Sequence, residues 1–552
     1  MDIESYPLST LPGTTALFRD FTEMAGFPEQ TGVRRWYPAD PFSLAWAGAS
    51  SALEAEQRVS LANALAEQAK QFAAGPAALA NIASLREGAA AVVTGQQVSL
   101  FGGPLLTLLK AATAIRKAQD ATAAGGRKHV PIFWMASEDH DLAEANQVAL
   151  PSKTGGQPAV ETLRLGFEAS RPLPVGGLRL EDGGAENGES LEATLDRACA
   201  LLGWAPICDL LRECYAPGAT MASAFGKLLS RIFAAHGLVV MDAGSRAFHA
   251  MGATVLRAAL EHADELKEAL LQRSVELEEE GYHAQVLVTL DHSLLFLMDH
   301  ENGARRPLLR LAQGGWKAGA KVYTTADLLE VLASEPERLS PNALLRPVFQ
   351  DAILPTAAYV AGPAEVAYFA QSEVLFRKIL GRVTPVLPRL MATLVEPVIA
   401  NTLAAHELRF SNVLEAKTAA ALAQQMGARA MPIEGKRKIA AVGNALEAEL
   451  AALTAYMASL SAELGRAAGV SASKMRYQMN RLRRMAANFE VQKESSLNRH
   501  ALAIMVNLFP NGHPQERVLG GIWFLARHEE DLASLLIHHA TGERAEHKVL
   551  YL

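Results

Sequence analysis

Residues 89–115 read AAAVVTGQQVSLFGGPLLTLLKAATAI, and this stretch decides the fold class. It begins with Ala89–Val93, a short apolar run of strand length, and ends in a pattern in which apolar residues recur every three or four positions. Pro104 stands at the start of that pattern, where a helix loses nothing from the missing N–H of proline. The stretch therefore predicts a strand, a glycine-containing loop and a helix in succession.

The same alternation continues on the C-terminal side of this unit. Val130–Met135 and Gly237–Met241 are apolar runs of strand length, and a third strand-like run passes through Tyr359 and Val360. Helical patterns separate these runs, which favours βαβ units around a parallel sheet. One pair of runs, within residues 286–298, flanks a polar tripeptide and predicts a β-hairpin instead.

The composition is that of a large globular protein. The 552 residues suffice for about three to four domains, and 50% of them are apolar while 20% are charged. The formal net charge is −7 and the isoelectric point is near 6.1. This balance gives no electrostatic reason to expect a nucleic acid or an anionic membrane as a partner.

Three features predict a cytoplasmic protein. Cys199, Cys208 and Cys214 fit no CxxC pattern, and we expect them to be buried as small apolar side chains in a reducing compartment. The N-terminal MDIESYPLST has neither the basic region nor the apolar core of a secretory signal. The longest charge-free run, between Glu87 and Lys110, contains polar residues and glycines that a membrane-spanning helix rarely accumulates.

The segment after Lys438 follows a seven-residue pattern. Apolar residues recur at this spacing, a stretch at Gly465–Ser473 reads as a break, and a second apolar series follows. Two long amphipathic helices are predicted, which form an antiparallel hairpin or pair with the hairpin of another chain. The arginines of the second arm are interpreted as a solvated face, with RNA binding as the alternative. The apolar positions are Ile439, Leu446, Leu453 and Leu460 in the first arm and Met475, Met479, Leu482, Met485, Ala486 and Phe489 in the second.

Thr94, Gln96 and Gln97 lie where the first predicted strand ends. Glutamine side chains at a strand end can donate and accept hydrogen bonds without carrying charge. The helix that opens at Pro104 would offer free backbone N–H groups to an anion. The competing interpretation is a plain turn with surface glutamines, and neither GxGxxG nor GxxxxGK[ST] occurs in this loop.

Glu138-Asp139-His140-Asp141 follows the second predicted strand. Asp141 has a local explanation, because an acid three residues before Glu144 fits a helix cap. Neighbouring carboxylates repel by about 1 kcal/mol per pair in water, so solvent, a divalent cation or a substrate ammonium group should offset the repulsion. His140 can act as an acid or a base near neutral pH. The competing interpretation is a solvated acidic helix start, and no metal site is predicted.

The segment Leu344–Glu373 gathers polar side chains within a mostly apolar stretch. A buried polar group must be paired, so their density predicts a binding surface. Glu365 also has a local explanation, since an acid in the first turn of a helix complements the helix dipole. The polar residues concerned are Arg346, Gln350, Asp351, Glu365, Tyr368 and Gln371.

Together these blocks resemble the bacillithiol biosynthesis cysteine-adding enzyme family. The matching stretches follow the order of the family and span nearly the whole chain, with a poor match at 150–200. They are VVTGQQVSLFGGPLLTLLKAATAI (Val92–Ile115), VPIFWMASEDHDLAEANQV (Val130–Val148), SPNALLRPVFQDAILPTAAYVAGPAEVAYFAQ (Ser340–Gln371), PVLPRLMATLVE (Pro385–Glu396) and NLFPNGHPQERVLGGIWFLARH (Asn507–His528).

The resemblance implies an α/β fold, with a Rossmann-like parallel-sheet core, inserted connecting segments and a C-terminal antiparallel α-helical coiled-coil hairpin that mediates homodimerisation. The core would cover 1–435 with insertions at about 150–225 and 255–340, the hairpin 436–500, and a segment packing back on the core 501–552. The implied activity is the last step of bacillithiol synthesis, the joining of L-cysteine to the glucosamine amine of glucosaminyl-malate. Neither an HxGH nor a KMSKS-type signature is present, so the activating cofactor stays unknown, with a nucleotide such as ATP or ADP as a candidate.

We expect the active site at the carboxyl end of the sheet, where α/β folds bind ligands. Asp139, His140 or Asp141 would hold the attacking ammonium group or take its proton. Arg346 or Arg389 would pair the malate carboxylates. Two other classes stay open, a non-catalytic dimeric sugar-binding scaffold and a nucleotidyltransferase with another substrate. The remaining candidate substrate contacts are Thr94, Gln96, Gln97, Glu138, Asn146, Gln350, Asp351, Glu365 and Tyr368.

Overall fold

A computed structural model describes residues 3–24, 32–49, 53–167, 172–182, 189–291, 293–541 and 544–552. Its centre is a parallel sheet in the order β14–β13–β2–β3–β6. Three successive strands run outward from β2 to one edge and two later strands run to the other, which is the Rossmann order and confirms the predicted fold class. The strands are β2 (Ala90–Gln97), β3 (His129–Ala136), β6 (Val239–Asp242), β13 (Thr356–Ala361) and β14 (Val386–Pro388).

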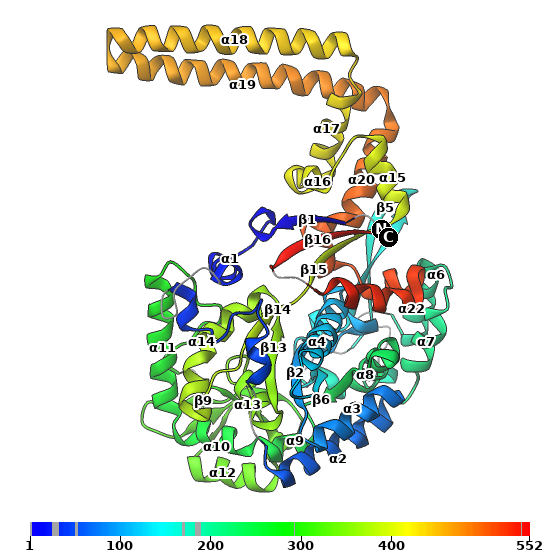
Figure 1. The fold of residues 1–552 in the computed structure, drawn as a ribbon, viewed down its shortest axis with the longest axis vertical. Coiled ribbons are helices and arrows are strands. Elements are labelled where there is room, and N and C mark those ends of the chain that lie inside the picture. Colours follow the sequence, from blue (N-terminus) through cyan, green and yellow to red (C-terminus); the bar gives the residue numbers. More distant parts are fainter. Residues whose placement is uncertain are drawn as a thin grey trace.

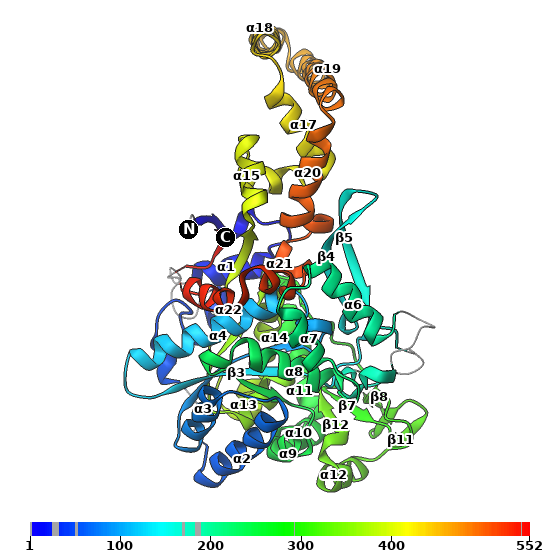
Figure 2. The ribbon, with the colours of Figure 1, turned by 90° about the vertical axis from the view of Figure 1, so that its right-hand side faces the viewer.

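Helices cover both faces of this sheet (Figures 1 and 2). Successive strand residues point to opposite sides, so Ile132 and Trp134 pack into one apolar core while Phe133 and Met135 pack into the other. The core of Phe133 contains residues of α4 (Leu106–Ala123), α8 (Met221–Ile232) and α22 (Gly521–His539). The core of Trp134 contains residues of α2 (Ala55–Gln71), α3 (Pro76–Arg86), α13 (Arg346–Ile353) and α14 (Pro363–Leu380).

The strand order creates a switch point between β2 and β13. These strands are hydrogen-bonded neighbours, yet the helices that follow them, α4 and α14, contribute to different apolar cores. At such a point the two connections leave the sheet in opposite directions, and α/β proteins bind their ligands beside the carboxyl ends of the two strands. The topology therefore predicts a ligand site among the residues that follow β2 and β13.

Two long insertions interrupt the core. Between β3 and β6 lie α5 (Leu142–Ala145), an antiparallel hairpin of β4 (Gln147–Thr154) and β5 (Gln157–Arg164), α6 (Leu191–Leu202) and α7 (Ile207–Cys214). Between β6 and β13 lie α9 (Arg246–Met251), α10 (Ala253–Glu261), α11 (Ala263–Glu279), β7 (Leu295–Met298), β8 (Arg305–Pro307), β9 (Leu309–Arg310), β10 (Trp316–Ala318), β11 (Lys321–Tyr323), α12 (Thr325–Ser334) and β12 (Leu339–Pro341).

The predicted hairpin at residues 286–298 is wrong. Only its second run forms a strand, β7, which pairs with β8 and β12. Leu287 and Leu290 are 81% and 80% exposed and belong to no strand, so an apolar run alone misled the prediction. His292, within the predicted turn, lies outside the described residues.

The C-terminal part returns to the core through a second sheet. In it β16 (Glu546–Tyr551) lies between β1 (Ile3–Pro7) and β15 (Met391–Val395), which brings the two ends of the described chain close together (Figure 1). Within the described residues, no helix is both long enough and apolar enough to cross a membrane. The other helices near the ends are α1 (Ala16–Glu23), α15 (Pro397–Ala405), α16 (Phe410–Ala416), α17 (Ala419–Ala430), α20 (Ser495–Leu508) and α21 (Gln515–Val518).

The predicted helical hairpin projects from the body of the molecule (Figure 1). It consists of α18 (Ile433–Leu460) and α19 (Ala462–Lys493), and the turn lies at Ser461, whose hydroxyl accepts hydrogen bonds from the Glu463 and Leu464 amides. The predicted break at Gly465–Ser473 is therefore wrong, since these residues are helical. Gly465 serves a close approach of the two arms, because a Cβ there would lie 2.7 Å from the Ala458 Cβ.

The seven-residue series predicts the inner face of the hairpin only in part. Ile439 and Leu446 are half-buried, whereas Leu453 and Leu460 are 49% and 58% exposed. The contact line of α18 runs through Gly443 and Leu450, which are buried, so the series of Leu453 and Leu460 lies beside that line. Several large apolar side chains of the hairpin consequently face solvent in the single chain.

Gly427 sets the distance between α17 and α19, and its substitution tests this packing. A Cβ there would lie 2.4 Å from the Ala487 carbonyl oxygen, so Gly427→Ala should destabilise the fold by about 1–3 kcal/mol through overpacking. Gly469→Ala is the matched control, because that helical glycine has nothing within 4 Å of its Cβ position and alanine favours a helix by about 1 kcal/mol. Scanning calorimetry should show a lower melting temperature for Gly427→Ala only; equal melting of both variants would contradict the packing argument.

Candidate functional site

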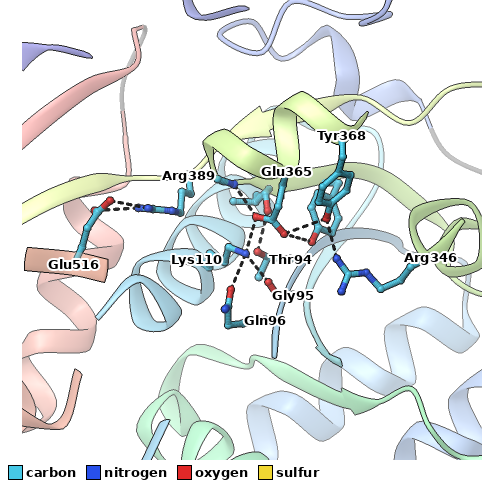
Figure 3. Close-up of polar contacts among 12 residues, drawn as sticks. Thr94, Gly95, Gln96, Lys110, Arg346, Glu365, Tyr368, Arg389 and Glu516 are labelled. Carbon is cyan, nitrogen blue, oxygen red and sulfur yellow. Dashed lines mark hydrogen bonds and ion pairs between the residues drawn. The ribbon is translucent and has the colours of Figure 1, made fainter. Parts of the chain in front are cut away.

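Lys110 of α4 is the central side chain of a polar cluster at the switch point (Figure 3). Its side chain is 5% exposed, and its Nζ lies 2.6 Å from Glu365 Oε2. The same ammonium donates to the Gly95 carbonyl at 2.7 Å and to Gln96 Oε1 at 3.0 Å. All three donors are satisfied, so the end of β2 is bound to the start of α14 through one lysine. Sequence reasoning missed Lys110, although a charge within the apolar run from Leu105 to Ile115 was a usable signal.

Glu365 is held by neighbours from three directions. The Gly362 amide donates to Oε2 at 2.7 Å and the Tyr359 hydroxyl donates to Oε1 at 2.8 Å, in addition to the Lys110 ammonium. Burial alone would raise the pKa of this carboxyl, but the Lys110 charge and the Gly362 amide outweigh it and lower the pKa. Burial lowers the pKa of Lys110. Next to this pair, the Arg346 guanidinium donates to the Tyr368 hydroxyl at 2.8 Å.

A second polar cluster lies at the ends of β3 and β6. His249 of α9 is fully buried, with Nε2 2.9 Å from Glu138 Oε1 and Nδ1 2.9 Å from the Leu339 carbonyl oxygen. Both ring nitrogens face oxygens, which fits the protonated imidazolium. Burial would lower the pKa of His249, but the Glu138 carboxylate and the backbone carbonyls raise it. The Ser137 hydroxyl donates to Asp242 at the end of β6, and burial raises the pKa of Asp242.

Arg305 of β8 contacts the segment that follows β3. Its Nη1 donates to His140 Nδ1 at 3.3 Å, and its guanidinium stacks 3.7 Å from the centre of the Phe296 ring. The charges of Glu138, Asp139 and Arg346 all act on it. On the other side, Gln97 Nε2 donates to the Asp141 carbonyl at 3.3 Å. Three segments distant in sequence therefore share one edge of the sheet.

A cavity of about 440 Å³ opens beside the second cluster. Its acidic wall carries Glu138 and Asp242, and the rest of the wall is mainly apolar, including Leu173, Met298 and Leu178. Such a volume suits a small molecule, and a few convergent polar groups in an apolar cavity are typical of a ligand site. The side chains of Asp139 and His140 are 43% and 37% exposed and are accessible from solvent.

The structure places several of the predicted contacts inside the protein. The Thr94 hydroxyl is fully buried and donates to the Val360 carbonyl across the sheet. Asn146 is buried and donates to the Leu165 carbonyl. Arg389 is occupied by Glu516, with nitrogen–oxygen distances of 2.6 and 3.0 Å. Each of these three side chains is committed to a neighbouring segment, and its expected contact with substrate stays a prediction.

Two of the predicted contacts on α13, Gln350 and Asp351, are buried in the structure. Asp351 forms an ion pair with Arg382 and lies near Thr356, the first residue of β13, so it is at the amino edge of the sheet, away from the switch point. Burial raises the pKa of Asp351 to about 6. Gln350 is buried one turn after Arg346. Helix α13 runs into the core of the protein, so the side chains of Gln350 and Asp351 lie away from the surface.

The expected anion site at the start of α4 is covered by protein. The Leu105 amide donates to the Leu519 carbonyl at 2.8 Å, and Pro104 forms a β-bridge with Gly520. A segment from the end of the chain thus takes the position that an anion was expected to occupy. Within the described parts of the chain, no group of three or more histidine, cysteine or acidic side chains is placed to hold a metal ion.

The three cysteines are free and buried, as predicted. Burial raises the pKa of Cys208 to about 12 and that of Cys214 to about 11. Since the thiolate is the nucleophile, these thiols have little nucleophilic character near neutral pH.

The Lys110–Glu365 pair should make a large contribution to the free energy of unfolding. Lys110→Met leaves a buried carboxylate without its counter-ion, and we expect a loss of about 3–5 kcal/mol in the free energy of unfolding at pH 7.5. The double variant Lys110→Met/Glu365→Gln should lose less than the sum of the single changes. Lys438→Met is the control, because its pair with Glu434 is exposed and should contribute at most about 1 kcal/mol.

The loss from Lys110→Met should also depend on pH. In the unchanged protein the pKa of Glu365 is lowered, so its stabilisation is present above the unfolded pKa of about 4.3 and is lost as the pH falls through the folded pKa. In Lys110→Met the unpaired Glu365 takes up a proton more readily, and the difference in unfolding free energy should shrink between pH 7.5 and pH 5. Urea unfolding measures it, and a pH-independent difference would argue against the pair.

Comparison with known proteins assigns the family. A model described as bacillithiol biosynthesis BshC, N-terminal Rossmann-like domain, matches residues 1–390, and one described as bacillithiol biosynthesis BshC, C-terminal coiled-coil domain, matches residues 392–552. The expected boundaries at 435 and 500 stay a prediction.

Relatives named BshC align over almost the full chain. The one from Koribacter versatilis is 39% identical over 99% of this chain and 98% of its own length. Those from Solibacter usitatus and Geobacillus kaustophilus are 35% and 28% identical, over 98% and 100% of this chain and equal shares of their own. With its Rossmann-like core and helical hairpin, the chain belongs to the BshC family of bacillithiol biosynthesis proteins.

Proposed function

We propose that the chain is an amide-forming ligase that joins the carboxyl group of L-cysteine to the glucosamine amine of glucosaminyl-malate, the last step of bacillithiol synthesis. The relatives of this chain carry names that describe a cysteine ligase. The observation that carries the proposal is the gathering of acidic and cationic side chains from three segments at the switch-point edge. The substrate carries both an amine and a dicarboxylate, so its binding site needs acidic side chains for the amine and cationic side chains for the carboxylates.

Asp139 is the best-placed candidate for the general base. Its Oδ1 accepts the His140 amide at 2.7 Å, which fixes the carboxylate while much of the side chain faces solvent. Asp141 accepts the Glu144 amide and caps α5, so its role is local. An amine attacks only after it loses its proton, and a carboxylate within hydrogen-bond reach can accept that proton.

His140 is better arranged as a hydrogen-bond donor than as a base. Arg305 donates to Nδ1, so the Nδ1 lone pair is occupied and the neutral ring carries its proton on Nε2. The Nε2–H can then donate to a carbonyl oxygen of the substrate, where negative charge develops during attack. Arg305 fixes the tautomer and orientation of this ring.

The Asp139 assignment is tested by product formation. The protein is incubated with glucosaminyl-malate and L-cysteine, with and without ATP, and the condensed thiol is quantified. Asp139→Asn should lower the turnover by about 100-fold or more, the usual contribution of a general base, while the melting temperature is retained. Glu268→Gln, an exposed acid on α11, is the matched control and should retain full turnover.

Other results would redirect the proposal. Full turnover of Asp139→Asn would remove this residue from the mechanism. Absence of product under every nucleotide condition would contradict the ligase and leave the sugar-binding scaffold or a nucleotidyltransferase with another substrate. The arms with and without ATP decide whether a nucleotide is consumed.

We further propose that the hairpin joins two chains into a homodimer. Met475, Leu482 and Phe489 recur every seven residues along α19 and are 49%, 56% and 63% exposed. Leu453 and Leu464 of the same hairpin are 49% and 47% exposed. A single exposed apolar residue is ordinary, but a regular apolar stripe on a projecting hairpin is typical of a coiled-coil contact.

The dimer is tested by analytical ultracentrifugation. Leu482→Glu combined with Met475→Glu should shift the protein from dimer to monomer, because two charges would be buried in the contact. Lys474→Glu changes the charge at an exposed position one residue before Met475, which a helix turns by about 100° from the stripe, and should leave the dimer intact. A monomeric unchanged protein, or a dimer that tolerates the double substitution, would contradict the proposal.

The cellular location is likewise proposed. Three free, buried cysteines and no membrane-spanning helix among the described residues support a cytoplasmic protein, since reduced thiols are typical of that compartment.

A further inference from the structure

The cavity with the acidic wall, of about 440 Å³, is lined on one side by the segment 173–178 of the first insertion. The Gly176 amide donates to the Ser137 carbonyl at 2.8 Å, and the Val175 amide donates to the Asp139 carbonyl at 2.7 Å. A Cβ at Gly176 would lie 2.5 Å from the Ser137 Cβ, so this close approach needs glycine. The segment 173–178 is therefore fixed against the turn that follows β3.

Each carboxylate of the acidic wall is bound to the protein through one of its oxygens. Glu138 Oε1 lies 2.9 Å from His249 Nε2, and Asp242 Oδ1 accepts the Ser137 hydroxyl and, at 3.0 Å, the Gly244 amide. Among the described residues, neither carboxylate has a further partner, so each keeps an oxygen for a ligand. Burial raises the pKa of Asp242 and the charge of Glu138 acts in the same direction, so a cation between the two carboxylates would be stabilised.

The rest of the lining provides few side chains that could form hydrogen bonds with a ligand. Leu173, Leu178 and Met298 are apolar. The two hydroxyl groups of the lining already have partners, since Ser137 donates to the acidic wall and Thr220 accepts a backbone amide of α8. The cavity therefore combines an acidic wall for a cation with apolar side chains for a short carbon chain.

These properties distinguish between the two substrates of the proposed reaction. The sugar-malate carries hydroxyl groups, which an apolar lining would leave unpaired, and two carboxylates, which the acidic wall would repel. Its amine must also lose a proton before it attacks, and two neighbouring carboxylates would oppose that loss. Cysteine instead carries an ammonium group that takes no part in the new amide bond and a thiol side chain that behaves as a small apolar group. The cavity therefore fits cysteine, and Asp139, which does not line it, stays available to the sugar amine.

We propose that this cavity binds L-cysteine and that Glu138 and Asp242 hold its α-ammonium group. The thiol side chain then packs against the apolar lining of Leu173, Leu178 and Met298. With the ammonium group and the side chain both held, the carboxyl group is the remaining substituent of the α-carbon and is left free to meet the sugar amine. The assignment rests on the proposed function.

Isothermal titration of the full-length protein tests the cavity without any need for catalytic activity. The two probes are L-cysteine and 3-mercaptopropionate, which is cysteine without its amine. Asp242→Asn keeps an oxygen for the Ser137 hydroxyl and the Gly244 amide but removes the charge, and it should weaken L-cysteine binding by about 10- to 100-fold, the usual effect of losing a hydrogen-bonded charge. Glu138→Gln should have the same effect. 3-Mercaptopropionate should bind the unchanged protein more weakly than L-cysteine does, and neither substitution should weaken it further.

A matched variant and a kinetic measurement control the result. Glu192→Gln neutralises an exposed acid of α6, in the same insertion as the segment 173–178, and should bind L-cysteine normally. Steady-state kinetics should show an increase in KM for cysteine in Asp242→Asn by the same factor, with KM for glucosaminyl-malate unchanged. Equal melting temperatures of Asp242→Asn and the unchanged protein exclude a folding defect, which keeps the test decisive if Glu138→Gln destabilises the buried His249.

Each other outcome has a distinct meaning. L-Cysteine binding of Asp242→Asn equal to that of Glu192→Gln would overturn the proposal, as would an unchanged protein that binds no L-cysteine. An equal loss of L-cysteine and 3-mercaptopropionate binding would also overturn it, because the ammonium group would then play no part. A protein that forms no product under any nucleotide condition, yet loses L-cysteine binding in Asp242→Asn, would contradict the ligase and support the amino-acid site. Product formation with an unchanged KM for cysteine in Asp242→Asn would support the ligase and overturn the site.

Discussion

The buried contact between Lys110 and Glu365 is the interaction on which the rest of this edge depends. Taking two charges out of water costs several kcal/mol for each ion, and only close geometry with additional hydrogen bonds offsets that cost. Here Gly95, Gln96, Gly362 and the Tyr359 hydroxyl supply those bonds. The pair therefore fixes how the loop after β2 meets the start of α14. The topology of the Rossmann-like sheet sends the connections after β2 and β13 to opposite faces. The ion pair fixes the position of these two connections relative to each other.

A second buried pair, Arg389 with Glu516, does the same for the end of the chain. It ties α21 to the residues after β14, while the Leu519 carbonyl caps the start of α4. The two family models divide the chain near residue 391, yet both sides of that division build one edge of the central sheet. The hairpin is joined to the body through α17 and α20, and α20 leads toward α21 (Figure 2).

The candidate site was predictable in outline but not in its pairings. The glutamines at the end of β2, the acidic run after β3 and the polar residues of α13 and α14 stood out in the sequence because polar groups in apolar stretches need partners. Which partner each one finds was not visible. Thr94 bonds Val360, Asp351 pairs with Arg382 at the far edge of the sheet, and Arg305 comes from an insertion with no marked pattern. The heptad series of the hairpin was visible too, but not which of its positions face the other arm.

The alternation of strands and helices, the parallel sheet and the helical hairpin could all be predicted from the order of the residues. These follow from local periodicity, because a strand or helix must bury one face wherever it packs. The packing of distant segments was needed to show that Arg389 is paired with Glu516 and that Lys110 lies at the centre of the polar cluster at the switch point. The physical reason is that charge pairing depends on distance in space. Arg389 and Glu516 are 127 residues apart in the chain, and no local pattern encodes which distant carboxylate a buried guanidinium will meet.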